Sequence, residues 1–221
     1  MLLDDEIFNI ISLTIRLTVV STLISSIIGI PLGIMIASKE FFLKKLVVLI
    51  NRTLMGTPPV VVGLVVFLLL MRNGPLGHFR LLFTFWAMVI AQTILIAPII
   101  CGIVYTAVEK SVHEIRAFAT TMGATKIQTN LLIIKELSSD IYFAMVTGFG
   151  RAMSEVGAIM IVGGNIRYHT RTMTTAISML NNAGDRDRAI VLGVILMTIA
   201  FSVQAIASLL RKEERPNSEN L

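Results

Sequence analysis

Five long apolar segments constrain the fold of this 221-residue chain more than any other feature. An α-helix rises 1.5 Å per residue, so about 20 apolar residues cross the hydrocarbon core of a bilayer. Composition agrees, since 55% of the residues are hydrophobic, 15% are charged and the mean hydropathy is +0.81. The sequence therefore predicts an all-α polytopic membrane protein, a single domain over residues 1–221 with about five transmembrane helices. The predicted spans are residues 7–37, 46–71, 81–108, 140–162 and 189–210.

A polar stretch, residues 109–139, separates the third and fourth spans. Its apolar residues first recur every three or four positions, a pattern typical of an amphipathic helix. Gly123 interrupts this pattern, and the same period resumes from Ile127. We therefore expect a helix–turn–helix loop at the membrane surface.

The distribution of Lys and Arg predicts the orientation, because cytoplasmic loops carry the excess of positive charge. With the N-terminus outside, the inner segments hold eleven of these residues and the outer segments hold six. The acidic start of the chain, Asp4–Glu6, also suits the outer side. This orientation places residues 109–139 and the C-terminus in the cytoplasm. The polar tail, residues 211–221, is predicted to be disordered.

Several functional classes find no support in the sequence. The basic residues form no stripe or stacking module for nucleic acid, and no phosphate-binding G-x-x-x-x-G-K-[ST] loop occurs, so any ATP must be bound by another chain. The three histidines lie far apart in the sequence, and Cys101 is the only cysteine. We expect no metal site, no cofactor and no covalent catalysis by this chain.

Arg151 and Glu155 are the most unusual residues of the fourth span. Charges inside a membrane are costly, and residues four apart lie on one face of a helix. Two interpretations are open: an ion pair that only fixes helix packing, or a charged face that lines a solute path or gate.

The segment Thr57-Pro58-Pro59 interrupts the second span. Proline removes a backbone donor, and carbonyls freed inside a membrane must be buried in protein or face a cavity. The segment is therefore either a simple kink or a broken helix whose backbone groups line a path. Residues 166–188, which are rich in Thr and Arg, are either an outer re-entrant or surface segment, whose arginines could meet an acidic partner, or a solvated loop.

The stretch EIRAFATTMGA, residues 114–124, resembles the E-A-A-x-x-x-G loop of binding-protein-dependent ABC importer permeases. Gly123, Ala124 and Ala119 match that loop. Phe118 replaces its first alanine, and Glu114 is acidic but out of register. The resemblance implies that this loop contacts a separate ATPase subunit, through Glu114, Ala119, Gly123, Ala124 and Lys126.

The stretch GFGRAMSEVGAIMIVGGN, residues 148–165, resembles the permeases of tungstate importers, and molybdate permeases have a related pattern. The double-proline segment is similar in the same group, and the likeness extends over residues 10–210. It implies a type I ABC importer permease fold in a prokaryotic inner membrane. The implied partners are a second copy of the chain, two ATPase subunits and an extracytoplasmic oxyanion-binding protein, with tungstate in transit. Arg151, Glu155, Thr57, Pro58 and Pro59 are the implied pathway or gate residues.

Other functions remain open at this point. The chain could carry molybdate or another oxyanion instead of tungstate. It could be an ion-coupled secondary transporter that uses Arg151 and Glu155 for proton coupling. It could also be a membrane scaffold without transport activity, in which the charged pair only fixes packing.

Overall fold

The computed structural model describes residues 5–213, and within this range the protein is helical and contains no strand. The all-α prediction is therefore confirmed for the described residues. The elements are α1 (Asp5–Ser38), α2 (Lys44–Met55), α3 (Pro59–Leu70), the short 3₁₀ helix η1 (Gly77–Phe79), α4 (Phe85–Thr121), α5 (Lys126–Glu136), α6 (Ser138–Met153), α7 (Gly157–Gly163), α8 (Met173–Asn182) and α9 (Arg186–Glu213).

Three of the described helices contain stretches long and apolar enough to cross a membrane: Asp5–Ser38, Phe85–Val112 and Arg186–Ala207. Two bent pairs of helices are also long and apolar enough when each pair is taken together. The axes of α2 and α3 differ by 100°, and those of α6 and α7 differ by 59°. Counting each bent pair as one span gives up to five crossings.

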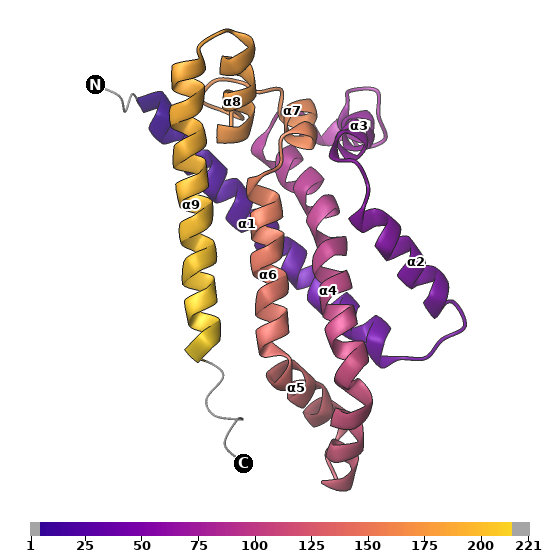
Figure 1. The fold of residues 1–221 in the computed structure, drawn as a ribbon. Helices are drawn as coiled ribbons and strands as arrows, with labels where there is room; N and C mark the ends of the chain where they lie inside the picture. Colours follow the sequence, from indigo (N-terminus) through magenta and orange to yellow (C-terminus); the bar gives the residue numbers. More distant parts are fainter. Residues whose placement is uncertain (1–4, 214–221) are drawn as a thin grey trace.

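Small residues on α1 bring it into close contact with α4. Ser21, Ser25, Gly29 and Gly33 recur every fourth residue, so they lie on one face of the helix. A β-carbon on Gly33 would lie only 2.7 Å from the carbonyl oxygen of Cys101. Such small residues let helix backbones approach each other in a membrane. This contact makes α1 and α4, which cross in Figure 1, the central pair of the bundle.

The polar stretch after the third span differs in part from its prediction. Residues 109–121 do not form a separate surface helix but continue α4 as one helix of 37 residues. No proline or glycine interrupts the chain between Gly102 and Gly123, so nothing ends the helix earlier. The predicted turn does lie at Gly123, whose φ is +69°, and α5 follows with a capping box between Thr125 and Gln128.

The two ends of the bundle are different. The α4–α5 corner projects at one end, and α8 lies at the other, beside the start of α1 (Figure 1). α9 runs from the α8 end toward the α5 end. Residues 211–213 belong to α9 and not to a disordered tail, while residues 214–221 lie outside the described residues.

Candidate functional site

The α6–α7 break holds the charged pair predicted from the sequence. α6 ends at Met153 and α7 begins at Gly157, so Glu155 lies between two helices and not on one continuous helix as the spacing suggested. The pair still forms, with 3.3 Å between Arg151 Nη2 and Glu155 Oε2. The side chain of Glu155 is 4% exposed and that of Arg151 is 37% exposed. A buried carboxylate is thus held beside a partly exposed cation.

Several backbone groups at the break have partners within the protein. The second carboxylate oxygen of Glu155 accepts a hydrogen bond from the backbone N–H of Ala158 at 3.2 Å, which anchors the start of α7. The carbonyl of Glu155 accepts a hydrogen bond from the hydroxyl of Thr174 on α8. The carbonyl of Ala152 accepts one from the side-chain amide of Gln92 on α4. These bonds fix the break in position, because unsatisfied backbone groups in a membrane are costly.

Gln92 and Thr174 were not identified from the sequence. Gln92 is 1% exposed, and its amide oxygen also accepts a hydrogen bond from the hydroxyl of Ser21 on α1, at 2.6 Å. A lone glutamine in the apolar run of the third span is the signal that could have indicated it, because buried polar side chains require partners. Thr174 lies among several threonines, and its sequence context does not single it out.

The double-proline segment forms the second break, next to the first. Pro58 is the N-cap of α3 and Pro59 is its first residue, which is the position where proline suits a helix start. α3 then packs closely on α7, since a β-carbon on Gly63 would lie 2.7 Å from Ala158 Cα. At the start of α3, Val60 lies beside Gly157, where a β-carbon would be 2.9 Å from its side chain. The structure therefore favours a broken helix over a simple kink and brings the two breaks together.

The predicted ATPase-contacting residues lie apart from these breaks. Glu114 is exposed on the last part of α4, Ala119 is buried, and Gly123 and Ala124 form the corner. Lys126 is the first residue of α5. The backbone N–H of Ala124 donates to the carbonyl of Ala119 at 2.9 Å, which closes the end of α4. A β-carbon at Gly123 would meet nothing within 4 Å, so the corner is open for contact with another molecule.

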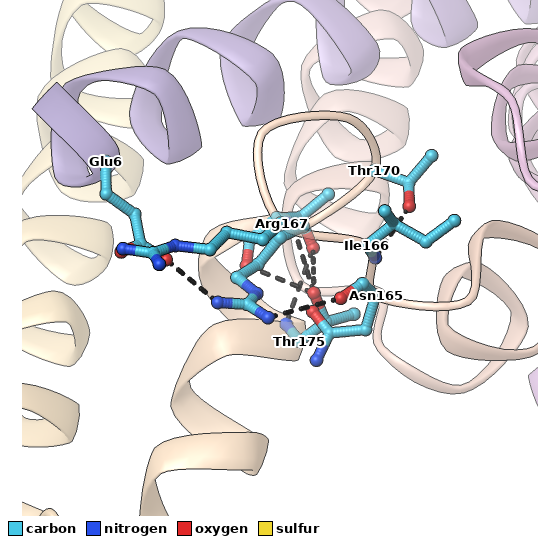
Figure 2. A network of polar contacts seen from close by, with 8 residues as sticks. Glu6, Asn165, Ile166, Arg167, Thr170 and Thr175 are labelled. Atoms are coloured by element: carbon cyan, nitrogen blue, oxygen red, sulfur yellow. Dashed lines mark hydrogen bonds and ion pairs between the residues drawn. The ribbon is translucent and has the colours of Figure 1, made fainter.

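The α8 end of the bundle contains an arginine–carboxylate cluster. Arg167 and Arg171 both donate to the carboxylate of Glu6, at 2.5 and 2.8 Å (Figure 2). The hydrogen bond with Glu6 raises the pKa of Arg167 above its ordinary value. These two arginines thus meet an acidic residue of the chain itself.

The residues around this cluster do not form a solvated loop. Thr170, Thr172, Thr174 and Thr175 are all buried. The hydroxyl of Thr172 accepts a hydrogen bond from the backbone N–H of Thr175, and the two residues form the capping box that begins α8. The Gly163–Asn165 turn takes positive φ at Gly164 and Asn165, as expected for a helix end. The re-entrant or surface interpretation of residues 166–188 is therefore the better one.

Among the described residues, no group of three or more His, Cys, Asp or Glu side chains is placed to hold a metal ion. The site is instead made of backbone breaks, one ion pair and a distant open corner. Such an arrangement can hold a charge inside a membrane and respond to movement of helices.

The sequence matches the family described as "Binding-protein-dependent transport system inner membrane component" over residues 29–215. The chain belongs to this family. It is a multi-pass membrane permease subunit with the type I ABC importer permease fold. Members of the family work with an ATPase and a binding protein, as the resemblance of the corner implied.

Three relatives of the permease cover most of its length. It is 44% identical to the tungstate uptake system permease protein of Peptoclostridium acidaminophilum, over 95% of this chain and 92% of the relative. It is 40% identical to the "Probable anion ABC transporter permease protein" of Haloferax volcanii, over 82% and 81%. It is 37% identical to the tungstate uptake system permease protein of Campylobacter jejuni, over 78% and 72%.

Proposed function

We propose that this chain is the permease subunit of an ABC importer for tungstate. The observation that carries the proposal is the 44% identity to a tungstate uptake permease over nearly the full length of both chains. An extracytoplasmic binding protein delivers the oxyanion, and a separate ATPase subunit binds and hydrolyses ATP. The chain itself acts through conformational change and not through covalent chemistry.

The proposed pathway lies between two copies of the chain. α2 has no buried residue, and its apolar side chains Leu46, Leu49 and Ile50 are all exposed. α2 lies at the edge of the bundle, beside α4 (Figure 1). A second copy facing α2 and α3 would enclose a path between the two pairs of breaks. Arg151 and Glu155, with Thr57, Pro58 and Pro59, then form the gate on each side of that path.

The proposed orientation puts the energy source and the delivery of substrate on opposite sides of the membrane. The excess of Lys and Arg in the predicted inner segments supports a cytoplasmic position for the α4–α5 corner, on the side where ATP is available. Residues Glu114 to Lys126 contact the ATPase there. The outer face, which includes α8 and the start of α1, receives the binding protein. Closure of the ATPases moves the corners, and the breaks change their exposure in response.

The experiment that tests this proposal is oxyanion uptake by reconstituted vesicles. Vesicles carrying the permease, its ATPase and its binding protein are loaded with ATP and given tungstate, molybdate or sulfate at equal concentration. We expect uptake of tungstate that is faster than uptake of the other two anions. Uptake should stop when the partner ATPase is inactivated by mutation and should persist when ionophores remove the ion gradients.

Three outcomes would contradict the proposal. Preferred uptake of molybdate or sulfate would overturn the substrate. Uptake that persists with an inactive ATPase but stops without an ion gradient would indicate a secondary transporter. No flux of any anion through a correctly assembled complex would favour a scaffold.

A further inference from the structure

Two long arms connect the α4–α5 corner to the α6–α7 break. α4 is one arm, and Gln92 lies near its start while the corner lies beyond its other end. At 1.5 Å per residue, Gln92 and Thr121 are about 44 Å apart along the helix. α5 and α6 form the second arm, because only Leu137 separates them, and α6 ends at the break. Both arms therefore start at Gly123 and run back toward the same region of the bundle (Figure 1).

A single side-chain bond joins the far ends of the two arms. The amide nitrogen of Gln92 donates to the carbonyl of Ala152 at 2.8 Å, and both residues are buried. Ala152 is the residue after Arg151 and precedes Glu155 by three, so this bond holds the end of α6 that carries the charged pair. Closer to the corner, Gly148 on α6 packs against Ile96 and Ile100 on α4. A β-carbon on Gly148 would lie 2.9 Å from Ile100 Cδ1.

The amide of Gln92 is held from its other side as well. Its oxygen accepts the hydroxyl of Ser21 on α1, so the amide can turn away from Ala152 only by losing both bonds. The carbonyl of Ala152 also faces the backbone N–H groups of Ser154 and Glu155, and the contact with Glu155, at 3.3 Å, is longer than the one with Gln92. In the membrane interior no water replaces a lost partner at low cost. Sliding of α4 along α6 is therefore opposed at this bond.

We infer that Gln92 is a positioning residue for transport: it transmits the displacement of α4 to the Arg151–Glu155 break through the carbonyl of Ala152. This inference rests on the proposed function, because it assumes that the corner is moved by an ATPase. Packed helices change state by small sliding steps, and a bond at the far end of two arms converts such a step into a displacement of the break. Gln92 does not contact the solute in this role.

A double-mutant cycle tests the inference, because residues that act as one unit have non-additive effects. The variants are Gln92→Met, which keeps the length of the side chain but removes its donor and acceptor, Glu155→Gln, and the pair together. Tungstate uptake and ATP hydrolysis are measured in vesicles at matched amounts of assembled complex, so that loss of folded protein is separated from loss of coupling. We expect Gln92→Met to lower tungstate uptake per ATP about fivefold or more. The double variant should be no worse than the more impaired single variant.

Two further variants keep the test decisive. Ser21→Ala removes the hydroxyl that holds the amide but leaves Gln92 itself, so it provides a milder change if Gln92→Met does not assemble. It should also be non-additive with Glu155→Gln. Thr106→Val is the matched control on α4, because its hydroxyl bonds only within the helix, to the carbonyl of Gly102. Its effect, if any, should be additive with Glu155→Gln.

The results separate the inference from the proposed function. A wild-type complex that takes up no oxyanion overturns the proposed function. A wild-type complex that transports tungstate while Gln92→Met and Glu155→Gln act independently overturns the inference alone. Unchanged uptake per ATP in Gln92→Met also overturns it, because a residue that only supports folding would reduce the amount of complex and leave this ratio unaltered.

Discussion

At the scale of single residues, the charged pair is asymmetric. Glu155 is almost fully buried, whereas Arg151 keeps contact with the surroundings. Removing the cation therefore leaves a carboxylate with a single backbone N–H as its described partner. An unpaired buried charge is among the most destabilising changes in a protein.

We expect Arg151→Ala to lower the free energy of unfolding by about 1–3 kcal/mol, below the cost for a fully buried pair because Arg151 is partly exposed. Adding Glu155→Gln should restore most of this loss, since the amide oxygen can still accept from Ala158 N–H and carries no charge. Thermal unfolding of the purified permease in detergent provides the measurement. A double variant less stable than Arg151→Ala would show that the destabilisation has another cause.

Gly123 offers a second test at this scale. Its positive φ and the open space around it match those of Gly184, which lies at the end of α8, at the opposite end of the bundle. Each glycine is replaced by Asn, a residue that tolerates the left-handed conformation, so backbone strain stays small and equal at both sites. We expect Gly123→Asn to insert into the membrane but to lose its association with the ATPase in a pull-down. Gly184→Asn should keep it, and equal association of both variants would refute the docking role of Gly123.

Single residues were predictable where their chemistry is rare in a membrane. The charges of Arg151 and Glu155 and the break at Pro58 and Pro59 stand out in apolar sequence. Gln92 was missed because one amide in a long apolar run gives no information on which helix it meets. Its partner on α6 is a backbone carbonyl. Every residue has such a group, so the sequence does not indicate which one Gln92 contacts.

At the scale of elements, the two bent spans have different causes. Prolines end the helical ladder between α2 and α3, so this break was predictable from the sequence. The α6–α7 break contains no proline. It persists because Gln92, Thr174 and the Glu155 carboxylate supply partners for the freed backbone groups, and these contacts exist only in the folded protein. A hydrophobic period continues through such a break, which is why one helix was expected.

The packing of α3 on α7 can be tested with two glycines. A β-carbon at Gly63 would approach the backbone of Ala158 at 2.7 Å, so Gly63→Ala should separate the two half-helices and lower the thermal stability of the permease. Gly193 on α9 has nothing within 4 Å of such a β-carbon. Because alanine is the better helix former, Gly193→Ala should be neutral or stabilising by up to about 1 kcal/mol. Comparable stability of the two variants in detergent would mean that α3 and α7 are not in close contact.

At the scale of the whole molecule, the α4–α5 corner lies far from the two helix breaks, so a conformational change that links them must travel along the helices. The prediction of about five spans agrees with the up to five crossings of the described residues, and Gly123 indicated the position of the corner. The unbroken length of α4 did not, because the change from apolar to polar residues near Glu109 resembles a boundary while the helix continues through it. A chain in which one continuous helix passes from the apolar bundle to the corner can carry a displacement over the full height of the bundle.

Orientation is the property on which this mechanism depends, and the single cysteine makes it measurable. Cys101 is buried, so its replacement by Ala gives a background without accessible thiols. Glu136→Cys at the end of α5 and Asn182→Cys at the end of α8 then introduce exposed probes at opposite ends of the bundle.

In intact cells a membrane-impermeant maleimide should label the probe at 182 and not the probe at 136. Inverted vesicles should give the reverse, because the predicted topology assigns eleven Lys and Arg residues to the inner segments and six to the outer segments. Retained tungstate uptake in both variants controls for misfolding, and labelling of position 136 from outside would leave the corner beyond the reach of any cytoplasmic ATPase.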